Sequence, residues 1–101
     1  MAREVFGPLL NVVPYDRLED AFARVNASDF GLQSAIFTED ISTVMKAHEE
    51  LEVGGVIHND ASAFRVDLMP YGGVKNSGLG REGPRHAIYE YTEPRILVIR
   101  K

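Results

Sequence analysis

The most constraining feature of the sequence is a glycine-rich stretch at residues 69–83. Five of the nine glycines in the chain fall within it. Glycine concentrates where the backbone must adopt positive φ or pass close to another group. Tyr71 stands near its start, and chemically varied side chains separate the glycines, namely Lys75, Ser77, Arg81 and Glu82. A flexible linker would lack this range of chemistry, so the stretch predicts a long ordered loop with a function.

Residues 78–83 also match the G-x-G-x-x-G pattern of a dinucleotide-binding fingerprint. That fingerprint requires a strand directly before it, a helix after it and an acidic residue about 20 positions further on. The preceding residues 75–77 indicate a loop, and no acidic residue stands at that distance before Lys101. We therefore expect no Rossmann-type site here, and the P-loop pattern is absent from the sequence as well.

The composition is that of an ordinary globular chain. Its 101 residues suffice for one domain or for a piece of a larger one, and 45% hydrophobic residues argue against disorder. A net charge of −4 offers no electrostatic footprint for nucleic acid. The absence of cysteine excludes disulfides and a cysteine nucleophile within the chain. No apolar run approaches membrane-spanning length, so we expect a cytoplasmic protein without nucleic-acid or membrane partners.

The hydrophobic pattern predicts alternating strands and helices as far as residue 59. Short apolar runs predict strands at residues 9–15, where Pro14 ends the run, and at residues 33–38 and 56–59. Between them, helical spacing predicts two amphipathic helices. The expected fold class is therefore α/β, with a βαβαβ order and a parallel sheet.

Local signals predict where these helices begin and end. Asp16 and Glu19 resemble a capping box for the first helix, whose apolar face would comprise Leu18, Ala21, Phe22 and Val25. Asp40 or Ser42 would cap the second helix, and residues 54–55, both glycine, would stop it. Its apolar face would comprise Ile41, Val44, Met45 and Leu51.

The C-terminal third predicts a long loop, a short helix and a strand. Residues 60–83 are mostly loop, Pro84 suits the first turn of a helix, and Pro94 would end it. The last apolar run comprises Ile96, Leu97, Val98 and Ile99. Because it does not alternate with polar residues, both faces of this strand should be covered. We expect the cover to come from another subunit, in a homo-oligomer.

Four segments together resemble the C-terminal part of the NAD(P)-dependent aldehyde dehydrogenases. Residues 4–8 resemble the family's E-x-F-G-P segment, 31–38 the strand after its "GL" turn, 70–82 its P-[FY]-G-G-x-K-x-S-G-x-G-R-E signature and 91–93 its "YTE" ending. The resemblance extends from Glu4 to Lys101. It implies that residues 1–91 are the C-terminal part of a catalytic domain and residues 92–101 an oligomerisation strand.

The resemblance also implies what lies outside this chain. The family's cofactor domain, catalytic cysteine and glutamate base all precede the matched part. We therefore expect a fragment of an enzyme that oxidises an aldehyde to an acid with NAD or NADP, inactive alone and without cofactor affinity of its own. The alternative is a non-catalytic interaction module that pairs through the last strand. A small anion-binding domain using the glycine-rich loop is a third, weaker hypothesis.

The family's cofactor and substrate positions map onto four residues. Glu4 matches the carboxylate that accepts both hydroxyls of the nicotinamide ribose, and Phe6 the ring that flanks the nicotinamide. Phe64 and Tyr71 match aromatics that line the aldehyde tunnel. The plainer alternatives are a solvated terminal acid for Glu4, a core residue for Phe6 and loop-covering rings for the other two.

Two charged residues carry the remaining hypotheses. Glu82 matches a glutamate suspected of relaying protons, and the alternative is a structural ion pair with Arg81 or a neighbouring subunit. Arg65 lies in a loop similar to the lactaldehyde and phosphonoacetaldehyde dehydrogenase branch. Its guanidinium could bind the anionic end of a substrate, or simply pair with Asp67 and order the loop.

The remaining polar residues predict structural roles. We expect Lys75, Ser77 and Arg81 to fix the loop and its interfaces rather than to act in catalysis. The three histidines have no metal-ligand spacing, so no metal site is expected; they are His48, His58 and His86.

Overall fold

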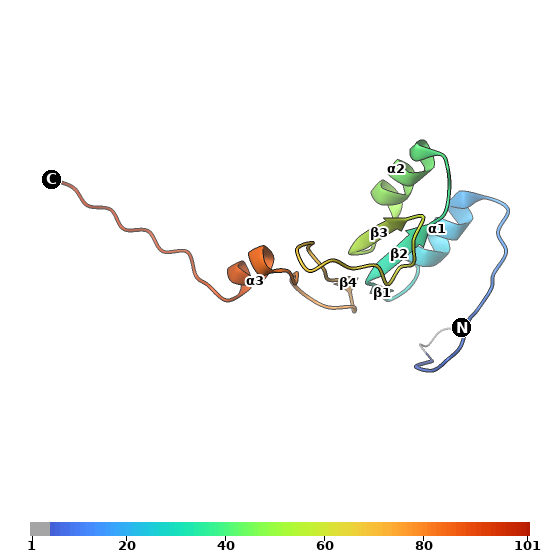
Figure 1. The fold of residues 1–101 in the computed structure, drawn as a ribbon, viewed down its shortest axis with the longest axis horizontal. Helices are drawn as coiled ribbons and strands as arrows, with labels where there is room; N and C mark the ends of the chain where they lie inside the picture. Colours follow the sequence, from blue (N-terminus) through green and yellow to red (C-terminus); the bar gives the residue numbers. More distant parts are fainter. Residues whose placement is uncertain (1–4) are drawn as a thin grey trace.

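A computed structural model describes residues 5–101 as an α/β unit with two extended ends. The elements in chain order are α1 (Leu18–Asn26), β1 (Phe30–Gly31), β2 (Gln33–Ile36), α2 (Ile41–Glu50), β3 (Gly55–His58), β4 (Val74–Lys75) and α3 (Pro84–Glu90). The chain measures 69 × 33 × 23 Å along its principal axes. Figure 1 shows α1, α2 and the strands gathered at one end and the C-terminal tail reaching the other, with α3 between them.

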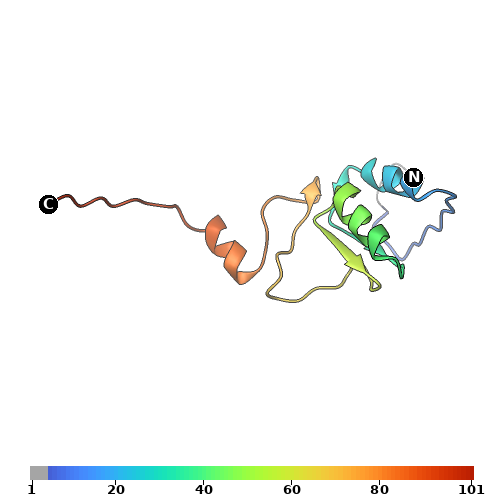
Figure 2. The ribbon, with the colours of Figure 1, turned by 90° about the horizontal axis from the view of Figure 1, so that it is seen from above.

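The centre of the fold is the unit β2–α2–β3. The two strands pair in parallel over four residues each, from Gln33↔Gly55 to Ile36↔His58. Helices α1 and α2 lie beside one another over the strands (Figure 2). The buried residues of this core are Phe22 of α1, Ala47 of α2 and Leu51 directly after α2, packed against Leu18, Ile36, Val53 and Val56. Burial of these apolar side chains is the main force that holds the two helices on one face of the sheet.

The expected first strand does not form. Residues 9–15 run as irregular chain without a strand partner, and the side chains of Leu10 and Val12 are 86% and 85% exposed. A strand needs a second backbone to satisfy its N–H and C=O groups, and no segment between residues 5 and 101 provides one here. The three-stranded βαβαβ expectation was therefore wrong for the described residues. The second sheet instead pairs β1 with β4 in antiparallel orientation.

The capping box expected at the first helix is also absent. Helix α1 begins at Leu18, and its N-cap residue Arg17 makes no side-chain cap hydrogen bond. The Glu19 side chain instead forms an ion pair with Lys46 of α2. The Lys46 ammonium holds the pKa of Glu19 below its ordinary value, mainly through this hydrogen bond. Glu19 therefore joins two helices rather than closing the end of its own.

The start of α2 follows the sequence signal. The Asp40 carboxylate accepts hydrogen bonds from the backbone N–H groups of Ser42 (3.0 Å) and Thr43 (3.1 Å). The Thr43 hydroxyl also donates to it, at 2.6 Å. These donors, the hydroxyl first, lower the pKa of Asp40 below its ordinary value of 3.8. Asp40, the first of the two expected candidates, is confirmed as the N-cap.

We expect Asp40→Ala to lower the thermal midpoint of the chain and its helix content, because two N–H groups of α2 lose their acceptor. The adjacent exposed acid provides a matched control, since Glu39→Ala removes the same charge and no cap. In the unfolded chain, Asp40 has its ordinary pKa of 3.8, and in the folded chain its pKa is lower. The stabilisation from Asp40 should therefore be complete above pH 3.8 and be lost as the pH falls through the lower pKa of the folded chain. Thermal melts followed by circular dichroism measure this, and equal midpoints for Asp40→Ala and Glu39→Ala would contradict it.

The end of α2 differs from expectation. The helix stops at Glu50, its C-cap residue Leu51 has φ −81°, and the glycines at 54 and 55 lie beyond it. The Asn26 side chain, at the end of α1, closes this end instead. Its Nδ2 donates to Glu50 O (2.7 Å), and its Oδ1 accepts from Glu52 N (2.8 Å). One amide therefore joins the C-terminal ends of both helices.

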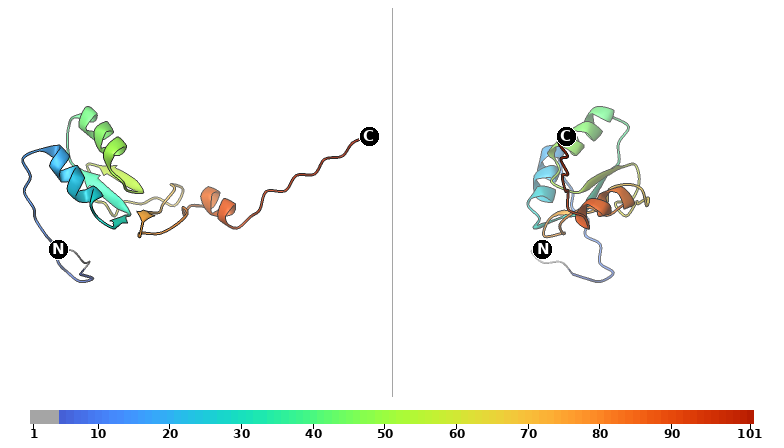
Figure 3. Two further views of the ribbon diagram at one scale, coloured as in Figure 1. Left: turned by 180° about the vertical axis from the view of Figure 1, so that it is seen from behind. Right: turned by 90° about the vertical axis from the view of Figure 1, so that its left-hand side faces the viewer.

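The C-terminal third is largely uncovered. Helix α3 begins at Pro84, as the sequence predicts, but ends at Glu90, before Pro94, and none of its residues is buried. Residues 92–101 form an extended tail that has no strand partner in the described chain (Figure 3). The apolar run at residues 96–99, for which we expect cover from another subunit, accordingly has no strand conformation within the described chain. Within residues 5–101, no helix has the length and apolar character needed to cross a membrane.

Candidate functional site

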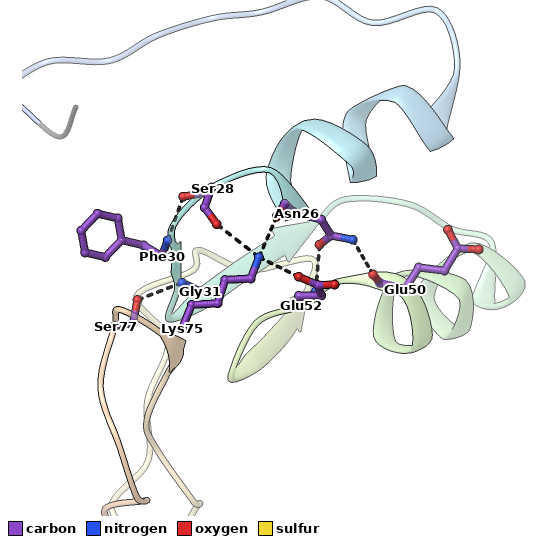
Figure 4. Close-up of polar contacts among 8 residues, drawn as sticks. All are labelled: Asn26, Ser28, Phe30, Gly31, Glu50, Glu52, Lys75 and Ser77. Carbon is purple, nitrogen blue, oxygen red and sulfur yellow. Dashed lines mark hydrogen bonds and ion pairs between the residues drawn. The ribbon is translucent and has the colours of Figure 1, made fainter. Parts of the chain in front are cut away.

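The glycine-rich loop is fastened to the α/β unit by Lys75. Its ammonium donates to the backbone carbonyls of Asn26 (2.7 Å) and Ser28 (3.2 Å) and pairs with Glu52 at 2.8 Å (Figure 4). Two of these partners lie at the C-terminal end of α1, where unpaired carbonyls and the helix dipole favour a cation. Lys75 therefore holds β4 against the ends of both helices.

Ser77 and Arg81 complete the fastening of the loop. The Ser77 hydroxyl accepts a hydrogen bond from Gly31 N at 2.9 Å, which ties the loop to β1 (Figure 4). The Arg81 guanidinium donates to the carbonyls of Gly73 (2.9 Å) and Gly80 (2.7 Å) and thereby joins the two sides of the loop. The loop-fixing contacts expected of Lys75, Ser77 and Arg81 are thus present.

Gly54 is where the loop backbone meets the α/β unit most closely. Its N–H donates to the carbonyls of Gly31 (3.1 Å) and Leu32 (2.9 Å). A Cβ atom at this position would overlap the carbonyl oxygen of Gly72 and lie 2.9 Å from that of Leu32. Glycine is required here for close approach of two backbones, not as a helix stop. Gly72 directly follows Tyr71, so this contact fixes the position of the loop backbone next to Tyr71.

The candidate site is a cluster of three side chains, Arg65, Tyr71 and Glu82. Tyr71 and Glu82 face one another across the base of the loop, where Tyr71 N donates to Glu82 O (3.1 Å) and Glu82 N to Tyr71 O (2.6 Å). This pair of backbone bonds closes residues 72–81 into a loop with a fixed base. Tyr71 and Glu82 therefore stay opposite one another even if the tip of the loop moves.

Arg65 joins this pair from the preceding segment. Its guanidinium carbon lies 4.3 Å from the centre of the Tyr71 ring, a cation–π distance, and its Nη2 lies 2.7 Å from Glu82 Oε2. The side chains of Arg65 and Glu82 are 41% and 65% exposed. An ion pair this open to water contributes at most about 1 kcal/mol. The contact orients the guanidinium but does not lock it.

Neither charge pairs with the residue of this chain that the sequence suggested as its structural partner. Glu82 pairs with Arg65 and not with Arg81, and Arg65 pairs with Glu82 and not with Asp67. The two residues stand 17 positions apart. No local pattern links positions so far apart, and the two meet because the segment after β3 folds back onto the base of the loop, where Tyr71 pairs with Glu82.

The other predicted site residues are not members of this cluster. Phe64 adjoins Arg65, its carbonyl accepts from Gln33 Nε2 at 3.3 Å, and its side chain is 43% exposed. Phe6 is 99% exposed on the N-terminal segment and touches almost nothing. Glu4 lies outside the described residues. A carboxylate such as that of Glu4 can accept hydrogen bonds from a cofactor ribose, and an exposed ring such as that of Phe6 can lie against a nicotinamide. The described residues, however, form no enclosed site around Phe6.

An open pocket of about 520 Å³ lies between the glycine-rich loop and α3. Tyr71 and Glu82 line it, whereas Phe64 and Arg65 do not. Glu82 therefore both borders this pocket and pairs with Arg65. Within residues 5–101, no three His, Asp or Glu side chains gather in a way that could hold a metal ion.

Comparison with known proteins gives one family throughout. A sequence profile described as "Aldehyde dehydrogenase family" matches residues 1–97. A 3-sulfolactaldehyde dehydrogenase from Priestia aryabhattai is 57% identical over 97 residues, which cover 96% of this chain and 20% of that protein. A lactaldehyde dehydrogenase from Methanococcus aeolicus is 41% identical, with 95% and 21% covered. The chain thus spans about a fifth of the length of these curated relatives.

Solved structures agree on the fold. The NAD+ complex of an aldehyde dehydrogenase from Bacillus cereus superposes with a TM-score of 0.85 at 37% identity, covering 90% of this chain and 18% of that one. The glyceraldehyde-3-phosphate dehydrogenase GapN from Methanocaldococcus jannaschii, complexed with NADP, gives a TM-score of 0.71 at 52% identity, with 74% and 16% covered. The α/β fold of the chain is therefore that of an aldehyde dehydrogenase segment.

Proposed function

The chain belongs to the aldehyde dehydrogenase family, and on that premise we propose that it forms the C-terminal part of an enzyme that oxidises a small anionic aldehyde. In this proposal, residues 1–91 belong to the catalytic domain and residues 92–101 form an oligomerisation strand. The overall change converts an aldehyde and water to an acid, with one hydride and one proton released. NAD or NADP supplies the hydride acceptor. The attacking cysteine lies outside this chain, which contains none.

The roles of the residues in this chain follow from their chemistry. The Glu4 carboxylate would accept the two ribose hydroxyls of the cofactor, and the Phe6 ring would limit the travel of the nicotinamide. Phe64 and Tyr71 would line the aldehyde tunnel and exclude water. Glu82, which borders the pocket beside the glycine-rich loop, would accept a proton and pass it toward solvent.

The proposal that the substrate is anionic rests on the position of Arg65. Its planar guanidinium is held over Tyr71, partly exposed and, among the described residues, engaged by one carboxylate oxygen. A guanidinium of this kind binds sulfonate, carboxylate or phosphonate through parallel hydrogen bonds. The relative that is 57% identical carries the name of an enzyme for a sulfonated aldehyde. That name supports the same class for this chain.

The test is a substrate comparison with the full-length enzyme. 3-Sulfolactaldehyde and lactaldehyde form a matched pair, since lactaldehyde lacks the sulfonate. We expect NAD(P)H absorbance to rise with both and kcat/KM to be higher for the sulfonate. The isolated 101-residue chain should give no turnover. Equal efficiency with the two substrates would overturn the anionic class, and no turnover with any aldehyde would overturn the enzymatic proposal itself.

The tail supports a second proposal, pairing with another copy of the chain. Ile96, Leu97, Val98 and Ile99 are 74–88% exposed. An uncovered apolar run on an unpaired backbone favours strand addition. We expect Val98→Lys to shift the full-length enzyme toward smaller species in light scattering, with Arg100→Lys as the control that keeps the charge. An unchanged mass for Val98→Lys at low protein concentration would count against pairing through the tail.

A further inference from the structure

The Glu82 carboxylate already occupies the place at Arg65 that the proposed function assigns to the substrate. Glu82 Oε2 lies 2.7 Å from Arg65 Nη2, the only hydrogen bond that Arg65 makes within residues 5–101. A guanidinium has five N–H donors in a planar fork and can serve a second acceptor or exchange the first. A carboxylate placed there is negatively charged and offers acceptor oxygens to the guanidinium, as the anionic end of a substrate does.

We propose that Glu82 is a specificity-determining residue, whose carboxylate competes with the substrate anion for Arg65. This inference rests on the proposed anionic substrate. In the absence of ligand, Glu82 neutralises the guanidinium and keeps it over Tyr71. When the anionic end of an aldehyde arrives, it displaces Glu82 from Arg65 or binds beside it.

The geometry of the cluster makes the exchange possible without moving the loop. Backbone bonds of 3.1 and 2.6 Å hold Tyr71 and Glu82 together, and the guanidinium carbon of Arg65 lies 4.3 Å from the centre of the Tyr71 ring. Only the Glu82 side chain has to turn. It is 65% exposed, so water can solvate the carboxylate when it leaves. An exposed pair is weak, whereas a bidentate pair with a ligand is stronger.

Whether the substrate anion displaces Glu82 or binds beside it, the charge of Glu82 lowers the affinity for the anion. If the substrate anion displaces Glu82, the lost ion pair subtracts from its affinity. If it binds beside Glu82, two negative charges repel each other across one guanidinium. In either case Glu82 weakens binding of anions and leaves binding of neutral aldehydes unaffected. Displacement also releases the Glu82 carboxylate toward the pocket that it lines, where its proposed proton transfer takes place.

Binding of methanesulfonate to the full-length enzyme, followed by ligand-observed NMR titration, tests this proposal without any turnover. Uncharged dimethyl sulfone serves as the neutral probe. We expect Glu82→Gln, which keeps the size of the side chain, to bind methanesulfonate about two- to fivefold tighter than the unmodified enzyme. Binding of dimethyl sulfone should not change. In an Arg65→Ala background the substitution should have no effect on methanesulfonate.

Asp67→Asn is the matched control. It removes a negative charge from the same loop, two positions from Arg65, and Asp67 makes no hydrogen bond to Arg65. We expect it to change methanesulfonate affinity less than Glu82→Gln does. Equal or weaker binding by Glu82→Gln would overturn the competition while leaving the anionic substrate class intact. If Arg65→Ala alone left methanesulfonate binding unchanged, the assignment of the anion to Arg65 would fail instead.

Discussion

Alanine at Gly54 is expected to destabilise the chain by at least about 2 kcal/mol, while alanine at the adjacent Gly55 leaves its stability nearly unchanged. A Cβ atom at Gly54 would overlap the carbonyl oxygen of Gly72, and a backbone atom cannot move aside as a side chain can. At Gly55 the nearest atom would be the Gln33 side-chain nitrogen, at 3.4 Å. The two substitutions add the same methyl group one residue apart and differ only in what it meets.

Urea unfolding of the chain, followed by circular dichroism, gives the comparison. We expect the midpoint to fall for Gly54→Ala and to stay within error for Gly55→Ala. Hydrogen exchange adds a local readout, since Gly54 N–H is bonded to Gly31 O and Leu32 O and should lose protection when the backbones separate. Similar midpoints for the two variants would mean that the contact between Gly54 and Gly72 can relax at little cost.

The parts of the fold that the sequence predicts well depend on neighbours in the chain. Asp40 caps α2 through N–H groups two and three positions away, and Pro84 occupies the first turn of α3. Such signals act within one turn, so a short pattern contains everything needed to recognise them. The amphipathic pattern likewise placed Phe22 and Leu51, two of the three buried core residues.

The parts that were missed depend on residues far apart in the chain. The run at residues 9–15 has strand character, but a strand forms only where another backbone lies beside it. Asn26 closes the end of α2 from 24 positions away, so no helix-stop pattern near residue 54 could reveal it. Glu19 had the right spacing for a capping box, yet Lys46 of the neighbouring helix engages its carboxylate.

The candidate site shows the same division. Tyr71 and Glu82 were recognised because both belong to the glycine-rich signature, and their backbone bonds bring them together. The pairing of Arg65 with Glu82 could not be predicted, since it depends on how the segment after β3 folds back onto the loop. Phe6 shows the opposite case, in which a residue matched the family pattern while the described chain provides no surface against which it could pack.

Arg65→Ala in the full-length enzyme is expected to lower kcat/KM for 3-sulfolactaldehyde by about 10- to 150-fold, and that for lactaldehyde by much less. Charge-assisted hydrogen bonds contribute about 1.5–3 kcal/mol, which converts to this range. The side chain is 41% exposed and shares its charge with Glu82, so we expect a value near the lower end. Lysine at this position keeps the charge but loses the planar fork and should recover only part of the efficiency.

Arg85→Ala is the matched control, because it removes an exposed cation on α3 that makes no hydrogen bond or ion pair in the described chain. It separates loss of a specific guanidinium from loss of overall positive charge. The quantity to compare between variants is the ratio of kcat/KM for 3-sulfolactaldehyde to kcat/KM for lactaldehyde. A general disturbance of the loop lowers both values equally and leaves this ratio unchanged. A loss shared equally by the two substrates would make Arg65 a loop-ordering residue, held in place by Tyr71 and Glu82, with no part in recognising the anion.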